Sequence, residues 1–170
     1  MTTIAIDSRG EFIAADGQVT CSGAVVTTTL RKILVETENG NPRIYAMAGT
    51  TCMFEALVKW HKDGHKPSEL PPASDGKWTL LVIDRKGARS YGHEAPYAEL
   101  VPYPYALGTG NEYALGALKA GASAEEAVRI ACEIDIHSGG EIQVVNIKEA
   151  LGMAPRLVAS APTSKSDYPV

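Results

Sequence analysis

The second residue of the chain carries two groups that can do chemistry together. The sequence begins Met1-Thr2-Thr3, and removal of the initiator methionine would leave Thr2 with both a hydroxyl and a free α-amine. Because an α-amine titrates at about pH 8, it can take the hydroxyl proton directly or through a water molecule. Thr2 could therefore act as nucleophile and base at once, although many cytosolic chains begin Met-Thr for no catalytic reason.

Two charged residues further along the chain could support such a threonine. Asp16 ends an apolar run and precedes a glycine, a position where aspartate is commonly a turn residue. Lys32 follows Arg31, and a lysine beside an arginine is usually solvated. Strand alternation would nevertheless direct one of these two cations inward. A partly buried ammonium near Thr2 would favour loss of the hydroxyl proton and keep the α-amine neutral at about pH 7.

Two glycine-containing motifs also stand out. The run Asp135-Ile136-His137-Ser138-Gly139-Gly140, taken alone, is typical of a helix C-terminus ended by glycines. The run Gly108-Thr109-Gly110 could be a fragment of a phosphate-binding loop. Because it lacks the Gly-Lys-Ser/Thr ending and the full spacing, we do not expect nucleotide binding there.

Together these motifs resemble those of the proteasome β subunit and its bacterial relative, the HslV peptidase, from Thr2 to about Ile147. The Asp-Gly-Gln-x-Thr run that starts at Asp16 is most similar to HslV. The Asp-x-x-Ser-Gly-Gly pattern that starts at Asp135 is similar to the proteasome β subunit. The resemblance implies an N-terminal nucleophile hydrolase, a threonine endopeptidase that cleaves peptide bonds through an acyl-enzyme on Thr2.

The resemblance also implies roles for the matching polar residues. It pairs Asp16 with an active-site lysine, and the family spacing selects Lys32. It places Asp135 and Ser138 in support of the catalytic threonine. The family usually has serine where this chain has Thr109, which keeps the hydroxyl near the amine but adds a methyl group.

The same resemblance implies where a substrate would bind. Thr20 and Gly49 would hold an extended peptide by backbone hydrogen bonds, as in strand addition to a sheet edge. The N–H of Gly49 would face the developing oxyanion. Met47 would line the pocket for the residue before the cut and favour apolar side chains. A core methionine on a strand is an equally good interpretation of Met47.

The spacing of apolar residues predicts an α+β fold. Strand pairs are expected at 3–7 with 11–16, 30–36 with 43–48 and 78–84 with 88–92, before a last strand at 141–147. Helices are expected at 51–63, 111–120 and 123–134, the last starting with a capping box of Ser123 and Glu126. By resemblance, this order is a four-layer αββα sandwich with two antiparallel sheets between helical layers. We expect one domain over 2–154 and a loosely ordered tail over 155–170.

Composition limits the class of protein. The net charge of -4, without a dense basic cluster, argues against nucleic acid as a partner. No apolar run approaches the roughly 20 residues that span a bilayer, so no membrane association is expected. Three cysteines without metal-like spacing, and no leader, predict a cytoplasmic protein with reduced, mostly packed thiols. His61 and His65 are expected to be a solvated pair and not metal ligands.

The resemblance further implies partners and leaves alternatives open. We expect a homo-oligomer, a ring or a spiral, that encloses the active sites and is fed unfolded polypeptide by an ATP-dependent unfoldase. The chemistry needs no organic cofactor, although carbonyls near Ile136 and Ser138 could hold a structural monovalent or divalent cation. Two alternatives are a catalytically silent assembly subunit of this type and an N-terminal nucleophile amidase that acts on small amides.

Overall fold

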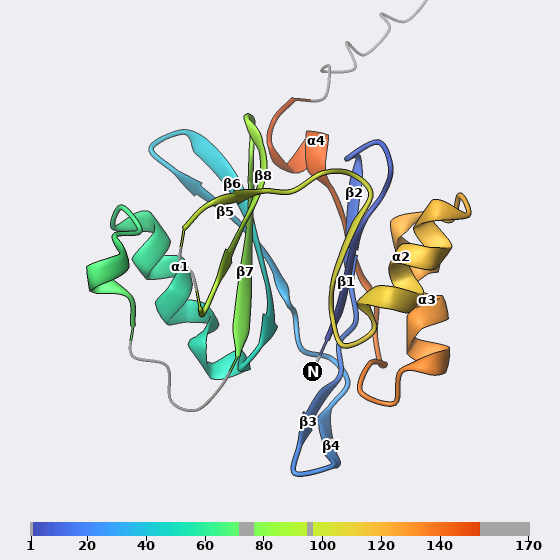
Figure 1. Cartoon of the computed structure of the whole chain (residues 1–170). Coiled ribbons are helices and arrows are strands. Elements are labelled where there is room, and N and C mark those ends of the chain that lie inside the picture. Colours follow the sequence, from blue (N-terminus) through green and yellow to red (C-terminus); the bar gives the residue numbers. More distant parts are fainter. Residues whose placement is uncertain (1, 72–76, 95–96, 154–170) are drawn as a thin grey trace, which may run out of the picture.

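Two antiparallel sheets form the centre of the computed structural model, which describes residues 2–71, 77–94 and 97–153 (Figure 1). The first sheet has the order β10-β1-β2-β11, with strands at Tyr105–Gly108, Thr3–Ile6, Phe12–Ala15 and Gln143–Asn146. The second has the order β5-β6-β7-β8-β9, with strands at Ile33–Glu38, Asn41–Gly49, Trp78–Asp84, Gly87–Gly92 and Glu99–Leu100. A separate hairpin pairs β3 (Val19–Cys21) with β4 (Ala24–Thr27).

Helices cover the outer face of each sheet (Figure 1). Helix α1 (Phe54–Lys62) lies on the five-stranded sheet, whereas α2 (Asn111–Lys119) and α3 (Ala124–Ile134) lie on the four-stranded sheet. A short helix α4 (Ile147–Ala150) follows β11. The expected α+β sandwich with αββα layers is therefore confirmed. Within the described ranges, no helix has the length and apolar character to cross a membrane.

Strand alternation divides the core into layers. Ile4 and Ile6 on β1 face Ile44 and Ile83 of the other sheet, in a cluster of branched aliphatic side chains between the sheets. On the opposite face of the four-stranded sheet, small residues such as Ala5 contact α2 and α3 and let these helices approach closely. Bulkier side chains fill the layer between the five-stranded sheet and α1; they include Tyr45, Met47, Leu57, Trp60 and Leu80.

The predicted helices and strands agree with the structure except at four places. The hairpin β3–β4, the strands β9 and β10 and the helix α4 were not expected. Strand β10 begins at the end of a segment rich in proline and tyrosine. Ser123 caps α3 as predicted, because its hydroxyl accepts a hydrogen bond from the Glu126 N–H at 3.2 Å. The tail expected over 155–170 lies outside the described residues.

Pairing of β1 with its two neighbours brings distant parts of the sequence to the N-terminus of the chain. Thr3 lies opposite Gly108 on β10, and Ile4 lies opposite Ala15 on β2. Asp16 follows directly after Ala15, and its N–H donates to the Thr3 carbonyl at 3.1 Å. The ends of three strands thus meet where the polypeptide starts, and this junction positions the residues described next.

Candidate active site

Thr2 lies immediately before β1 and is fully buried. Its neighbour Gly108 has a φ of +97°, and a Cβ added to Gly108 would lie 1.9 Å from the Thr2 carbonyl oxygen. Only glycine therefore allows β10 to pass this close to the Thr2 backbone. The Thr2 hydroxyl is buried and has no hydrogen-bond partner among the described residues. A buried polar atom without a partner is costly and is a common feature of functional sites.

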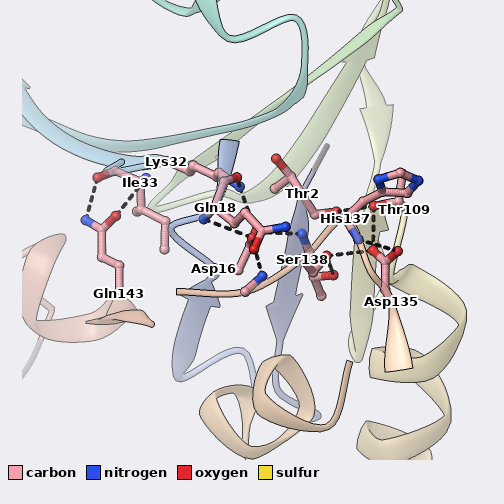
Figure 2. Close-up of polar contacts among 12 residues, drawn as sticks. Thr2, Asp16, Gln18, Lys32, Ile33, Thr109, Asp135, His137, Ser138 and Gln143 are labelled. Carbon is pink, nitrogen blue, oxygen red and sulfur yellow. Dashed lines mark hydrogen bonds and ion pairs between the residues drawn. The ribbon is translucent and has the colours of Figure 1, made fainter. Parts of the chain in front are cut away.

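A buried ion pair lies on one side of Thr2 (Figure 2). Lys32 Nζ donates to Asp16 Oδ1 at 2.8 Å and to the Gln18 carbonyl at 2.7 Å. Lys32 and Asp16 are 2% and 1% exposed, so the pair lies inside the protein. Arg31 is exposed, which confirms that Lys32 is the cation that points inward.

Three backbone N–H groups around the pair also donate hydrogen bonds to the Asp16 carboxylate. Its Oδ1 also accepts the Thr3 N–H at 2.8 Å, while Oδ2 accepts the N–H groups of Gln18 at 3.2 Å and Gly139 at 3.0 Å. Burial lowers the pKa of Lys32 because it disfavours the ammonium, and the attraction of the Asp16 carboxylate opposes this effect. The Asp16 carboxylate therefore favours the charged form of the buried Lys32 ammonium.

A second polar network lies on the other side of Thr2 (Figure 2). Asp135 Oδ2 accepts the hydroxyls of Thr109 at 2.6 Å and Ser138 at 2.7 Å, and Oδ1 accepts the His137 N–H at 3.1 Å. Burial alone would raise the pKa of Asp135, but these hydrogen bonds outweigh it and lower the pKa below its usual value. Asp135 is therefore an ionised acceptor near the start of the chain.

Proton counting gives the direction of the remaining bonds in this network. A hydroxyl has one proton and a carboxylate only accepts, so Ser138 and Thr109 each donate their one hydrogen bond to Asp135. The Thr3 hydroxyl, which lies 2.7 Å from Ser138 Oγ, must then donate to it. Thr109 Oγ1 also lies 3.4 Å from the Thr2 carbonyl, which competes more weakly for the same proton. The lone pairs of the Thr109 hydroxyl consequently remain available as acceptors.

The sequence Gly108-Thr109-Gly110 has a steric explanation at this site. Besides the close approach of Gly108 to Thr2, a Cβ at Gly110 would lie 2.1 Å from Thr3 Oγ1. The two glycines leave room for Thr2 and Thr3, and the threonine between them reaches Asp135. The motif therefore packs around the N-terminal residues Thr2 and Thr3.

Two hollows border the site. A cleft of about 460 Å³ is lined by Thr2, Gly49 and Thr109, so the buried threonine faces an open space beside the end of β6. A second, largely apolar hollow of about 310 Å³ is lined by Lys32 and Met47, among others. Met47 is 2% exposed and also packs in the layer against α1, so both interpretations of this residue apply. Thr20 lies on β3, half-buried.

Structural comparison reveals the architecture to which this site belongs. HslV from Trypanosoma brucei superposes with a TM-score of 0.62 at 19% sequence identity, covering 86% of this chain and 99% of that one. The chain has the HslV fold. Thiobacillus denitrificans BPH aligns with a TM-score of 0.60 at 20% identity, covering 86% of this chain and 98% of its own. A structure of that protein in complex with epoxomicin aligns equally well, with a TM-score of 0.60 at 18% identity, 86% of this chain and 99% of its own. No protein-family model matches the sequence, and curated proteins give no significant match.

Within this HslV fold, the structure corrects two expectations. His61 is 9% exposed and lies between the hydroxyls of Tyr45, at 3.2 Å from Nδ1, and Tyr91, at 3.4 Å from Nε2. The two histidines are therefore not a solvated pair, because His61 is buried and stacks on the exposed His65. The expectation of mostly packed thiols is also wrong, since two of the three free cysteines, Cys21 and Cys52, are exposed.

The cation expected near Ile136 and Ser138 stays a prediction. The Ile136 carbonyl accepts a hydrogen bond from Gln18 Nε2 at 3.2 Å, so one of its two lone pairs is already used. The described part of the chain contains no cluster of three or more His, Cys, Asp or Glu residues arranged for a metal ion.

Sequence reasoning missed three polar residues of this site. Thr3 and Gln18 contribute to the two networks, and Gln143 hydrogen-bonds the backbone of Ile33, next to Lys32. Thr3 could have been found, because strand alternation points its side chain away from that of Thr2, toward polar groups on the other face of the first strand. A glutamine on a short strand has no comparable signal in a single sequence.

Proposed function

We propose that this chain is an N-terminal threonine endopeptidase of the proteasome and HslV type. The observation that carries the proposal is the Thr2 hydroxyl. It is buried without a partner among the described residues, between the Lys32–Asp16 ion pair and the network around Asp135 (Figure 2). Removal of Met1, which the small side chain of Thr2 permits, would supply the α-amine that this hydroxyl lacks as a partner.

In the proposed reaction, Thr2 Oγ1 attacks the carbonyl carbon of a peptide bond. The α-amine takes the hydroxyl proton and later gives it to the leaving amine. The Lys32 ammonium favours the deprotonated oxygen, and the lone pairs of Thr109 can accept an N–H of the amine. The Gly49 N–H stabilises the oxyanion. A water molecule then hydrolyses the ester on Thr2 and regenerates the enzyme, without a cofactor.

The substrate of the proposed peptidase is an extended, unfolded polypeptide. Gly49 lies at the end of β6 beside the Thr2 cleft, and Thr20 lies on β3, so both backbones belong to strands that an added peptide could pair with. The apolar hollow beside Met47 favours an apolar side chain before the cut. Strand addition also distinguishes this proposal from an amidase of small molecules.

The quaternary proposals follow from the HslV fold. A ring or spiral homo-oligomer would enclose the Thr2 sites, an ATP-dependent unfoldase would feed it, and the assembly would act in the cytoplasm. Native mass spectrometry of the purified protein tests the assembly directly: the proposal expects a closed or extended homo-oligomer, and a monomer at micromolar concentration would contradict it.

The test of the activity compares variants on two kinds of substrate. Fluorogenic peptides with apolar residues before the cut should be hydrolysed by the native chain and by Thr2→Ser, but not by Thr2→Ala. Thr37→Ala, on β5 and outside the site, serves as the matched control and should retain activity. Turnover of small amides with none of peptides would favour the amidase, and inactivity of the processed chain on both would favour a silent subunit.

A further inference from the structure

Gln143 makes an unusual contact between the two sheets. Its side-chain Nε2 donates to the Ile33 carbonyl at 2.7 Å, and its Oε1 accepts the Ile33 N–H at 3.0 Å. This is the pair of bonds that two directly opposed residues exchange in an antiparallel ladder. Strand β5 is at the edge of its sheet, so the Gln143 amide supplies at Ile33 the neighbour that the sheet does not.

The position of Gln143 relates this contact to the ion pair. Gln143 is the first residue of β11 and lies opposite Ala15, the residue before Asp16. Ile33 is the first residue of β5 and follows Lys32. The amide therefore joins the start of β5, directly after Lys32, to the strand that pairs with the end of β2, directly before Asp16. Figure 2 shows the Gln143–Ile33 bonds beside the bond between Lys32 and Asp16.

The aliphatic cluster between the sheets does not set this distance sharply, so the distance depends on directed hydrogen bonds. These are the Gln143–Ile33 pair, the bond from the Leu30 N–H to the Gly17 carbonyl at 3.0 Å, and the bonds of Lys32 Nζ to Asp16 and Gln18. The cluster between the sheets consists of aliphatic side chains, and apolar contact has no preferred direction. Hydrogen bonds have narrow limits in length and angle, so a paired amide resists sliding of one strand end past the other. Ile33 is 3% exposed, so its backbone groups would be unsatisfied if the glutamine moved away.

We propose that Gln143 is a positioning residue that, together with the bonds of Lys32 and Leu30, fixes the separation of Asp16 and Lys32 and so places the Lys32 charge beside Thr2. The inference rests on the proposed function for its kinetic consequences. In this role Gln143 does not need to contact a reacting atom. Loss of the amide pair would let the start of β5 shift relative to the end of β2, and a shift of about 1 Å at a catalytic group can cost about 100-fold in rate.

The variant Gln143→Glu tests this with nearly constant shape. A protonated carboxyl can donate to the Ile33 carbonyl and accept its N–H, as the amide does, whereas an ionised carboxylate cannot donate. The kcat of Gln143→Glu relative to the native chain should therefore fall about 10- to 100-fold as pH rises through the titration of the new carboxyl, with KM nearly unchanged. Gln143→Met, which cannot titrate, should show a reduced kcat whose ratio to the native value is independent of pH.

Val144→Thr is the matched control, because this neighbouring residue of β11 is 40% exposed and touches neither network. Circular dichroism at each pH verifies that the variants are folded. A ratio for Gln143→Glu that is flat with pH and equal to that of Val144→Thr would overturn the inference. So would a Gln143→Met variant with native kcat.

A second measurement separates this inference from the proposed function. NMR titration of lysine labelled with ¹³C at the ε position reports the pKa of Lys32 without any substrate. If Gln143→Met loosens the pair, the pKa of Lys32 should fall further than in the native chain, because Asp16 opposes the effect of burial. An unchanged Lys32 titration would refute the positioning role. A native chain without peptidase activity, but with the expected shift, would refute only the proposed function.

Discussion

Replacement of Asp16 by asparagine should disable the site and destabilise the fold together. The carboxylate accepts four hydrogen bonds, from Thr3 N, Lys32 Nζ, Gln18 N and Gly139 N, and offers no donor. Asparagine can accept at only one end. In either orientation its amide N–H₂ would face two donors, and Lys32 would lose its counter-charge while still buried.

The size of the effect follows from the burial of the pair. Removing one partner of a buried ion pair costs about 3–5 kcal/mol, because the other charge is left uncompensated. For a domain of this size, 1 kcal/mol lowers the melting temperature by about 2–4 °C, so Asp16→Asn should lower it by about 6–20 °C. Thermal unfolding followed by circular dichroism at pH 7 measures this. Peptide hydrolysis by Asp16→Asn should be lost even below the melting temperature.

An exposed ion pair provides the control. Lys59 and Asp63 on the surface lie 2.6 Å apart with side chains 75% and 57% exposed, so Asp63→Asn should cost at most about 1 kcal/mol. The double variant Asp16→Asn/Lys32→Met should regain part of the stability, without activity, because it removes the uncompensated ammonium. The reasoning is refuted if Asp16→Asn is no less stable than Asp63→Asn.

Three further predictions concern neighbouring residues. Thr3→Val removes the donor to Ser138 at nearly constant volume, and urea unfolding should show a loss of about 1 kcal/mol that Thr3→Ser avoids. Burial lowers the pKa of His61 to about 4, so the unfolded chain binds its proton first and stability falls as pH falls from about 6.5. Urea titrations at pH 7 and 4 should show a loss about 3 kcal/mol larger for the native chain than for His61→Gln, and equal losses would contradict this. Gly108→Ala should lose both peptide hydrolysis and at least about 2 kcal/mol, because its Cβ would collide with the Thr2 carbonyl.

Much of the fold could be predicted because its local signals agree with its packing. The first hairpin, the strand pair β7–β8 and helix α3 all have clear apolar spacing and turn or capping residues. The inward position of Lys32 followed from alternation together with the family spacing. By contrast, β10 follows a Pro- and Tyr-rich segment, and its pairing with β1 is a long-range contact that local patterns do not record.

In the candidate active site, too, local motifs predicted some features and long-range contacts determined the others. The positions of Asp16 and Asp135 could be anticipated from motifs. The bonds that join Thr3, Ser138 and Thr109 through Asp135 depend on how the start of β1 meets the segments that follow β10 and α3. His61 was misjudged because a glycine three residues later suggested an exposed helix end. The packing of α1 on Tyr45 and Tyr91 buries this side chain instead.

The central claim is that Thr2 becomes the N-terminal nucleophile. Intact mass spectrometry of the purified protein, before and after incubation with a peptide epoxyketone, tests it most directly. The account predicts a mass that lacks methionine, one adduct per chain, and a peptide map that places the adduct on Thr2, with none on Thr2→Ala. A chain that keeps Met1 and forms no adduct, or an adduct that persists in Thr2→Ala, would contradict it.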